Sequence, residues 1–392
     1  MTSIEEAIQF VKEHSKPLLK SIYKTVEKAG GYELFENVDS PINMPPFRQS
    51  AMDGYALNLH DNLTYQLIGE VKAGDVRQTI LKPGEAVRIF TGAPVPNSSN
   101  AVVMQEKVIA NGDNISIENK VEVNMNIRPL GEQVKKGEQA LAKNTKLTPA
   151  AIGYLSSLGI SKVNVFKKPS IALITTGNEL VEAGSELTYG KIYESNSKML
   201  LSALYSLKFY DVTIHKVEDD FEKTQSKLDT VINENDLVII TGGISVGDYD
   251  FVGKALNTLR ITEHFYKVKQ KPGKPLFFGT KQNTAVFALP GNPAAALTCF
   301  YVYVYITLQK MMNHQDIELP RVNATSISAF KKFGDRPQFL KAIHINGSVE
   351  ILEGQSSAMQ QTFALSNALV FMREEVTNIE IGDTVEVILL PV

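Results

Sequence analysis

The stretch TAVFALPGNPAAAL, Thr284–Leu297, is an apolar run that ends in a Pro-Gly-Asn-Pro turn and continues into an alanine-rich, helix-forming segment. Two earlier stretches have the same design, SIALITTGNEL at Ser170–Leu180 and NDLVIITGGISVGDYD at Asn235–Asp250. Continuous apolar strands that lead into glycine-rich loops are typical of a parallel sheet with helices on both faces. In such a sheet the loops gather at the carboxyl edge, where ligands usually bind. The three stretches therefore predict a doubly wound, mostly parallel α/β domain with a ligand site at that edge.

On either side of this central part the pattern of apolar and polar residues is different. Residues Ile4–Ala29 have helical apolar spacing, and from there to about Leu147 short alternating runs predict an antiparallel β-rich region. From about Glu318 strand-like runs return and predict a small β-barrel. The sequence thus predicts a mixed α/β multidomain chain, in which β-rich domains and a C-terminal β-barrel flank the central α/β domain. We expect a discontinuous linking domain at 1–40 and 135–168, a β-rich domain at 41–134, the α/β domain at 169–316 and the barrel at 317–392.

Composition and charge narrow the class of protein. Of the 392 residues, 43% are hydrophobic and 21% are charged, and the formal net charge of -3 argues against a nucleic-acid partner. Cys299 is the only cysteine, so an internal disulfide is excluded and a reducing compartment is expected. The first residues lack a signal-peptide pattern, and Pro-Gly-Asn-Pro interrupts the uncharged segment Gln282–Gln309. We expect a cytoplasmic protein without a membrane-spanning helix.

The second of the three loops has the residue types of a phosphate and cation site. In TGGISVGDYD, backbone amides beside Gly242, Gly243 and Gly247 could approach a phosphate. Asp248 and Asp250, which follow, could hold a divalent cation. A tight turn between a strand and a helix explains the glycines equally well.

Lysines near a turn strengthen the case for an anionic ligand. The stretch YKVKQKPGKPLFFG carries four of them, Lys267, Lys269, Lys271 and Lys274. Lysine binds tetrahedral oxyanions as a point charge, although a lysine run standing alone is more often a solvated face. Asn292 stands at a helix start that could take an anion, where capping alone would also explain it. Glycine loops, lysines and loop carboxylates in one chain together favour a polyanionic ligand bound with a cation.

Six motifs together resemble one family. SAMDGYAL, RIFTGAPVP, TTGNEL, TGGISVGDYDF, KPGKPLFFG and LPGNPAAAL occur in the order found in the molybdopterin molybdenumtransferases, known as MoeA in bacteria and as the E domain of gephyrin in animals. The resemblance covers essentially the whole chain. It implies an elongated four-domain homodimer whose α/β domain binds molybdopterin, with each site between this domain of one subunit and the β domain of the other. The implied reaction inserts molybdate into adenylylated molybdopterin, releases AMP and depends on Mg²⁺.

The resemblance also assigns roles to residues and suggests partners. The implied catalytic residues are Asp53, Glu179, Asp219, Lys267 and Lys271. The implied Mg²⁺ ligands are Asp53, Glu179 and Asp250. The implied ligand-binding residues are Thr91, Thr176, Gly177, Asn196, Gly242, Gly243, Ser245, Gly247, Asp248, Lys274, Pro290, Gly291 and Asn292. Expected partners are molybdopterin adenylyltransferase and molybdoenzyme apoproteins.

Three departures from the family pattern leave other functions open. Arg48 stands where many relatives carry an aspartate, and Gln133 replaces a carboxylate implicated in metal or molybdate handling. Gln361 and Thr362 stand at the place of a C-terminal family serine. The chain could therefore be a divergent paralogue that inserts slowly or prefers tungstate, or a non-catalytic scaffold for the nucleotide-pterin. It could also be a molybdopterin adenylyltransferase, although the flanking β domains argue against that class.

Overall fold

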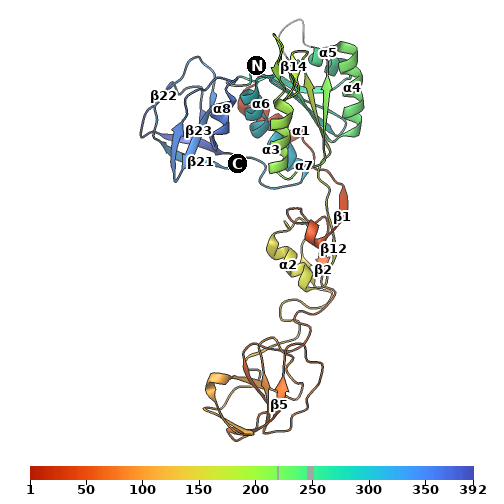
Figure 1. Ribbon diagram of the computed structural model, residues 1–392, viewed down its shortest axis with the longest axis vertical. Coiled ribbons are helices and arrows are strands. Elements are labelled where there is room, and N and C mark those ends of the chain that lie inside the picture. The colour runs from red at the N-terminus through yellow and green to blue at the C-terminus, as the bar shows by residue number, and fades with distance from the viewer. Residues whose placement is uncertain (219, 245–250) are drawn as a thin grey trace. The chain divides into compact units, whose positions relative to one another are not determined.

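The computed structural model of the chain describes residues 1–218, 220–244 and 251–392. These residues form two compact units, one of Met1–Lys20 with Lys167–Val392 and the other of Ser21–Phe166 (Figure 1). The first unit contains the three strand-to-loop stretches from which the fold was predicted. Each unit has its own buried core.

A six-stranded sheet forms the centre of the first unit. Its strand order is β16 (Val212–Val217), β13 (Ile171–Thr176), β17 (Leu237–Thr241), β20 (Thr284–Leu289), β19 (Pro275–Lys281) and β18 (Thr262–Lys267). The first four strands are parallel, and β19 and β18 are antiparallel at one edge. Every residue of β13 and β17 is buried, as a sheet covered on both faces requires. The predicted doubly wound, mostly parallel α/β fold is confirmed.

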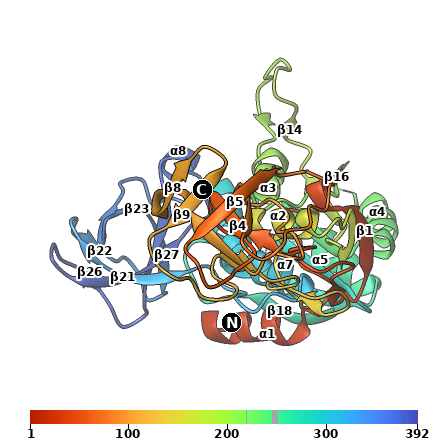
Figure 2. The ribbon, with the colours of Figure 1, turned by 90° about the horizontal axis from the view of Figure 1, so that it is seen from below.

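Helices cover both faces of this sheet. Figure 1 shows α4 (Phe221–Glu234) and α5 (Phe251–Thr258) on one face, and α3 (Asn196–Ser206) and α6 (Pro293–Cys299) on the other. Apolar side chains of α4 and α5 form one core with those of β13, β17 and β20. Beyond the end of β13, a short parallel pair of β14 (Leu180–Val181) and β15 (Ile192–Tyr193) frames an excursion of the chain that stands away from these layers (Figure 2).

The first helix is shorter than its apolar spacing predicts. α1 (Ile4–His14) begins with a capping box, in which the Ser3 hydroxyl accepts from the Glu6 amide and the Glu6 carboxylate accepts from the Ser3 amide. The prediction of helix as far as Ala29 is wrong. Pro17 cannot donate a helical hydrogen bond, and residues beyond it form β1 (Ser21–Thr25), which pairs with a distant strand. Tertiary pairing thus overrides local helical spacing here.

The uncharged segment after β20 is a buried helix. α6 continues through a π-helical turn, η3 (Phe300–Val304), into α7 (Tyr305–Met311). All five residues of η3 are buried, and the Tyr303 hydroxyl donates to the side chain of Gln270. No helix within the described residues is long and apolar enough to span a membrane. The expectation that this segment is core is confirmed.

The C-terminal part of the first unit is a closed barrel, as predicted. Its strand order is β21 (Arg321–Ser326), β24 (Ser348–Ile351), β23 (Gln338–Ile345), β25 (Ala368–Met372) and β27 (Thr384–Leu389). Alternating buried side chains fill the barrel with an apolar core. A short pair, β22 (Phe330–Lys331) with β26 (Asn378–Ile379), and the helix α8 (Gln360–Ala364) complete this part.

The second unit contains a six-stranded sheet. Its strand order is β7 (Ala101–Met104), β4 (Gly54–Leu57), β6 (Glu85–Ile89), β5 (Thr64–Val71), β9 (Asn114–Ile117) and β8 (Val108–Asn111). All neighbouring strands are antiparallel except β5 and β6, which are parallel. This pair departs from the antiparallel arrangement that the sequence predicts. The connection from Val71 to Glu85 explains the difference, because it is long enough for the crossover that a parallel pair needs. The short helix η2 (Gln105–Lys107) follows β7.

A smaller part of the same unit joins segments that are distant in sequence. β1 pairs with β12 (Lys162–Phe166), and β2 (Val38–Asp39) pairs with β11 (Gln139–Leu141). α2 (Pro149–Ser157) and the short helix η1 (Val26–Lys28) pack on these strands around a common core. A further short pair joins β3 (Gln49–Ser50) to β10 (Ile127–Arg128). The four predicted domain boundaries themselves stay a prediction.

Gly54, which follows Asp53 in the MDGY motif, offers a test of the packing in the second unit. β4 lies between β6 and β7, and a Cβ atom on Gly54 would lie 1.8 Å from the carbonyl oxygen of Val103. We expect Gly54→Ala to lower the free energy of unfolding by about 2 kcal/mol or more, because strand backbone must shift to admit the methyl group. Urea unfolding followed by circular dichroism measures this change.

Gly30→Ala is the matched control in the same unit, since a Cβ atom on Gly30 would meet no atom within 4 Å. We expect it to change the free energy of unfolding by less than about 0.5 kcal/mol. Equal effects of the two substitutions would contradict the tight approach of β4 and β7.

Candidate ligand pocket

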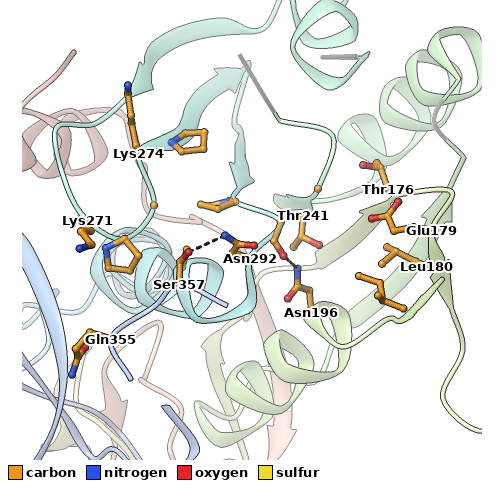
Figure 3. A pocket seen from close by; sticks show the side chains of 18 of the residues that line it. Thr176, Glu179, Leu180, Asn196, Thr241, Lys271, Lys274, Asn292, Gln355 and Ser357 are labelled. Atoms are coloured by element: carbon orange, nitrogen blue, oxygen red, sulfur yellow. Dashed lines mark hydrogen bonds between the residues drawn. The ribbon is translucent and has the colours of Figure 1, made fainter. Parts of the chain in front are cut away.

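The three predicted loops begin at the same edge of the central sheet. β13, β17 and β20 are adjacent and parallel, with Thr175 opposite Thr241 and Thr241 opposite Leu289. The loops that follow these strands therefore leave the sheet side by side, as the repeated strand-to-loop design predicts. A cavity of about 570 Å³ lies where they meet (Figure 3).

The cavity contains nine of the residues predicted to bind ligand or to act in catalysis. These are Thr176, Glu179, Asn196, Gly242, Lys271, Lys274, Pro290, Gly291 and Asn292. They come from all three loops, from the start of α3 and from the Pro-Gly turn before β19. The remaining lining residues are Leu180, Ile192, Thr241, Pro272, Gly273, Pro275, Ala295, Arg336, Gln355 and Ser357.

The charges of the cavity are divided between its two sides. Figure 3 shows Lys271 and Lys274 on one side, and Thr176 and Glu179 on the other. Arg336 adds a third cation, and its Nη1 donates to the carbonyl oxygen of Gln270 at 2.9 Å. A cavity with cations on one side and a carboxylate on the other suits an elongated ligand with one anionic end.

Two buried oxygen atoms of residues that line this cavity have no hydrogen-bond partner among the described residues. They are Oγ1 of Thr176 and Oδ1 of Asn196. The other polar atom of the Asn196 amide, Nδ2, donates to the carbonyl oxygen of Gly291 at 2.8 Å and so fixes the orientation of the side chain. Leaving a buried polar atom unpaired costs about 1–3 kcal/mol, so both oxygens are candidate contacts for a ligand.

The asparagines of the cavity do not cap helices with their side chains. Ser195, not Asn196, is the N-cap of α3. Asn292 is the N-cap of α6, but its side chain makes no capping bond, and its Nδ2 donates to Oγ of Ser357 at 2.8 Å. The capping interpretation of the Asn292 side chain is therefore wrong, because its amide, like that of Asn196, joins separate segments of the pocket.

Glycines after the strands let the loops approach one another. Gly242 has φ of 82°, and a Cβ atom there would lie 2.5 Å from the carbonyl oxygen of Thr176. A Cβ atom on Gly243 would lie 2.5 Å from Oγ1 of Thr176. Gly177 and Gly243 do not line the cavity. A Cβ atom on Gly177 would lie 2.7 Å from Oε1 of the Glu179 carboxylate. Their role in this structure is to allow close packing of the loops.

The barrel contributes three pocket residues that the sequence analysis did not select. They are Arg336, Gln355 and Ser357. The Ser357 backbone also receives a hydrogen bond from the Ala294 amide at 3.1 Å, so it is tied to the start of α6. Gln361 and Thr362, the residues aligned with the family serine, do not line this cavity. The stretch GQSS, which follows a predicted strand, was the available signal for Ser357.

Several predicted residues lie elsewhere. Lys267 does not line the cavity, and its ammonium group lies 5.4 Å from the centre of the Tyr266 ring. Asp219, Ser245, Gly247, Asp248 and Asp250 lie outside the described residues. Within the described ranges, no group of three or more His, Cys, Asp or Glu side chains is placed to hold a metal ion.

Asp53 and Thr91, which belong to the second unit, lie against each other. Oδ1 of Asp53 accepts from the amide and from the hydroxyl of Thr91, both at 2.7 Å. These two hydrogen bonds, with a smaller contribution from the Arg88 guanidinium, hold the pKa of the Asp53 carboxyl below its ordinary value. The side chain is exposed, so the structure presents an oriented carboxylate at the protein surface.

Arg48 and Gln133, the two departures from the family pattern in this unit, both form hydrogen bonds with backbone carbonyl groups. Nη2 of Arg48 donates to the carbonyl oxygen of Ser99 at 2.7 Å, and Nη1 donates to that of Asn97 at 3.5 Å. Arg48 therefore braces the turn before β7. Gln133 is exposed, and its backbone amide donates to the carbonyl oxygen of Met44.

Comparisons with known proteins cover the chain nearly from end to end. Three family models match it, the MoeA N-terminal region (domain I and II) at residues 2–159, the probable molybdopterin binding domain at 172–310, and the MoeA C-terminal region (domain IV) at 323–390. The cavity described above is lined by residues of the second and third matched regions.

Relatives and a solved structure agree with these matches. The molybdopterin molybdenumtransferase of Haemophilus influenzae is 34% identical over 93% of both chains. The protein of the same name from Staphylococcus epidermidis is 31% identical over 99% of this chain and 95% of the relative. The crystal structure of the molybdopterin biosynthesis MoeA protein from Pyrococcus horikoshii OT3 has a TM-score of 0.82 and 30% identity, and the match covers 99% of this chain and 100% of that one.

The unpaired hydroxyl of Thr176 gives a test of the pocket that needs no ligand. We expect Thr176→Val to leave the free energy of unfolding unchanged or to raise it by up to about 1 kcal/mol, because a buried group without a partner is removed at constant shape. Thr307→Val is the matched control, since Oγ1 of buried Thr307 lies 2.7 Å from Oγ of Ser15. It should lower the free energy of unfolding by about 1–3 kcal/mol. A loss of equal size in both variants would show that the Thr176 hydroxyl is structural.

Proposed function

The chain belongs to the molybdopterin molybdenumtransferase (MoeA) family, and we propose that it inserts molybdate into adenylylated molybdopterin and releases AMP. The protein's class is a transferase of molybdenum cofactor biosynthesis. This class rests on two relatives named molybdopterin molybdenumtransferase, which align with 93% and 99% of the chain. One observation carries the finer proposal. A single cavity has three cations on one side and unpaired buried oxygens on the other.

The cationic side would hold molybdate and the phosphate groups. Ammonium and guanidinium groups bind such oxyanions through charge-assisted hydrogen bonds. Lys271 and Lys274 flank a Pro-Gly turn, which keeps their backbones close together. Arg336 is oriented by its bond to the Gln270 carbonyl and has further N–H groups to donate. The Ser357 hydroxyl, which accepts from Asn292, can donate its proton to the same oxyanion.

The opposite side would hold the organic part of the ligand. Thr176, Glu179 and Asn196 offer acceptor oxygens for N–H and O–H groups. Leu180 and Ile192 supply apolar surface beside them for a flat ring. A ligand that is a fused heterocycle at one end and an anion at the other would satisfy both sides at once. Adenylylated molybdopterin has this character.

Mg²⁺ fits this proposal as an ion held partly by the ligand. Magnesium retains several waters and binds one or two protein carboxylates together with substrate phosphates, so it does not need a preassembled cage. Glu179, in the cavity, and Asp53, with its lowered pKa, are the described carboxylates that suit this role. When bound, the ion would neutralise developing charge on the phosphate oxygens during release of AMP.

We propose further that the protein is a cytoplasmic homodimer in which Asp53 and Thr91 of one subunit serve the ligand of the other. The family resemblance motivates this assignment. The exposed Asp53 carboxylate supports it, because two hydrogen bonds from Thr91 fix the orientation of a charged group that is open to a partner subunit. Molybdopterin adenylyltransferase would supply the substrate, and molybdoenzyme apoproteins would receive the product.

Lys271→Ala tests the oxyanion side of the pocket. We expect the molybdate concentration for half-maximal AMP release to rise by about 10- to 100-fold, because a charge-assisted hydrogen bond worth about 1.5–3 kcal/mol is lost. The measurement is AMP release from adenylylated molybdopterin with Mg²⁺ and increasing molybdate, together with reconstitution of a cofactor-free nitrate reductase.

Lys281→Ala is the control, since Lys281 forms an ion pair with Asp229 and does not line the cavity. It should leave the molybdate dependence unchanged. Wild-type protein that binds the nucleotide-pterin tightly but releases no AMP at any molybdate concentration would refute the proposed enzyme and would favour the scaffold.

Mixed dimers test whether Asp53 acts across the subunits. Asp53→Asn and Lys271→Ala protein would be denatured together, refolded in equal amounts and assayed at a molybdate concentration too low for Lys271→Ala alone to release AMP. If Asp53 serves the partner's pocket, half of the dimers are mixed and one of their two sites is intact, so about a quarter of wild-type activity should return. No recovery, with dimers confirmed by ultracentrifugation, would show that Asp53 serves its own subunit.

A further inference from the structure

A buried lysine on the outer face of the barrel is bonded to the loop that enters the pocket, since its strand neighbours Leu340 and Ala342 fill the barrel core. Lys341 lies in β23 and is 4% exposed. Its ammonium group donates to three backbone carbonyl oxygens, those of Gly354 at 2.7 Å, Ser356 at 3.0 Å and Met359 at 3.2 Å. An ammonium group has three N–H donors, so these bonds use all of them.

The backbone of Lys341 forms further hydrogen bonds with the same loop. The Lys341 amide donates to Oε1 of Gln355 at 2.9 Å, and its carbonyl oxygen accepts from Nε2 of Gln355 at 2.9 Å. That carbonyl also accepts from the Leu352 amide at 3.1 Å. The segment 352–359 is therefore folded around one residue.

This segment carries two of the residues that line the pocket, Gln355 and Ser357. The amide of Gln355 is fully engaged with backbone groups of the barrel, so the loop's free donor toward the cavity is the Ser357 hydroxyl. Oγ of Ser357 accepts from Asn292, which leaves its O–H group able to donate to a bound oxyanion. The position of that hydroxyl thus depends on bonds made by Lys341, which does not itself line the pocket.

A buried cation in this place is not explained by stability alone. Burial lowers the pKa of the Lys341 ammonium group below its ordinary value, because the charged form loses hydration. No salt bridge to Lys341 is found within the described residues. An apolar side chain of similar length would avoid this cost but could not bind three carbonyl oxygens.

We propose that Lys341 is a positioning residue for the pocket, whose ammonium group holds segment 352–359 so that the Ser357 hydroxyl faces the bound oxyanion. The inference rests on the proposed function for the identity of that oxyanion. Lys341 would act through Ser357 and would not touch the ligand.

The barrel offers a matched control in a second buried lysine. Lys332 is 8% exposed, and its ammonium group donates to the backbone carbonyl oxygens of Arg373, at 2.9 Å, and Glu374. Neither of these residues nor Lys332 lines the pocket. Lys332→Met removes the same kind of interaction from the same barrel without disturbing segment 352–359.

The test compares full-length wild type with Lys341→Met, Lys341→Arg and Lys332→Met. Four quantities are measured, namely the affinity for molybdate alone and the affinity for AMP alone by calorimetry, the thermal midpoint, and hydrogen–deuterium exchange of amides in 352–359. We expect Lys341→Met to weaken molybdate binding by about tenfold or more and to speed exchange in this segment. Lys341→Arg should recover most of the affinity. Lys332→Met should lower the thermal midpoint but bind molybdate as wild type does.

Two results would overturn the proposal. One is wild-type molybdate affinity in Lys341→Met, and the other is an equal loss of affinity in Lys332→Met, which would reveal general destabilisation. If Lys341→Met does not fold, Gly354→Ala replaces it, because a Cβ atom there would lie 2.6 Å from Oγ1 of Thr362 and would displace the same segment. Unchanged molybdate affinity in that variant would also overturn the proposal.

Failure of the proposed function would give a different pattern. Wild-type protein that bound neither molybdate nor AMP would contradict the proposed function. The exchange comparison between Lys341→Met and Lys332→Met would then decide alone whether Lys341 holds the segment.

Discussion

The parallel pairing of three neighbouring strands is the constraint on which the pocket depends. Because β13, β17 and β20 run in the same direction and pair in register, their carboxyl ends lie in one row. Each strand is followed by a loop that contains glycine, and Gly242 lets two of these loops approach within a distance that a side chain would block. The ligand residues are brought together by backbone hydrogen bonds formed well outside the pocket.

The chemistry of the pocket follows from which polar groups remain unsatisfied there. Asn196 and Asn292 each use an amide N–H to join two segments, and Asn196 is left with an unpaired buried acceptor. Lys271 and Lys274 supply charge to the opposite side. The side chains that carry these donors and acceptors lose conformational entropy when the protein folds. Less entropy is therefore lost when a ligand binds. The barrel takes part through Ser357, whose place depends on a lysine that the ligand would not touch.

The sequence predicts the part of this site that is encoded locally. Each strand and its loop are contiguous, so the apolar runs and their turns identify Gly242 and Asn292 without knowledge of the fold, and the family resemblance adds Thr176. Arg336 and Ser357 belong to the barrel part of the chain, and only tertiary packing places Ser357 beside α6 and Arg336 beside Gln270. Lys341 could not have been selected, because a lysine in a sequence is normally expected at the surface. The error at Ile4–Ala29 has the same origin, since the partner strand of β1 begins at Lys162.

A crystal structure of the protein with molybdate and AMP would test the central claim most directly. The pocket at the ends of β13, β17 and β20 should contain both ligands, with oxyanion density within hydrogen-bond distance of Lys271 and Ser357. Oδ1 of Asn196 and Oγ1 of Thr176 should each gain a partner from a ligand or from a water that a ligand holds. Ligands bound elsewhere, with these two oxygens still unpaired, would contradict the assignment of this pocket as the site of molybdate insertion.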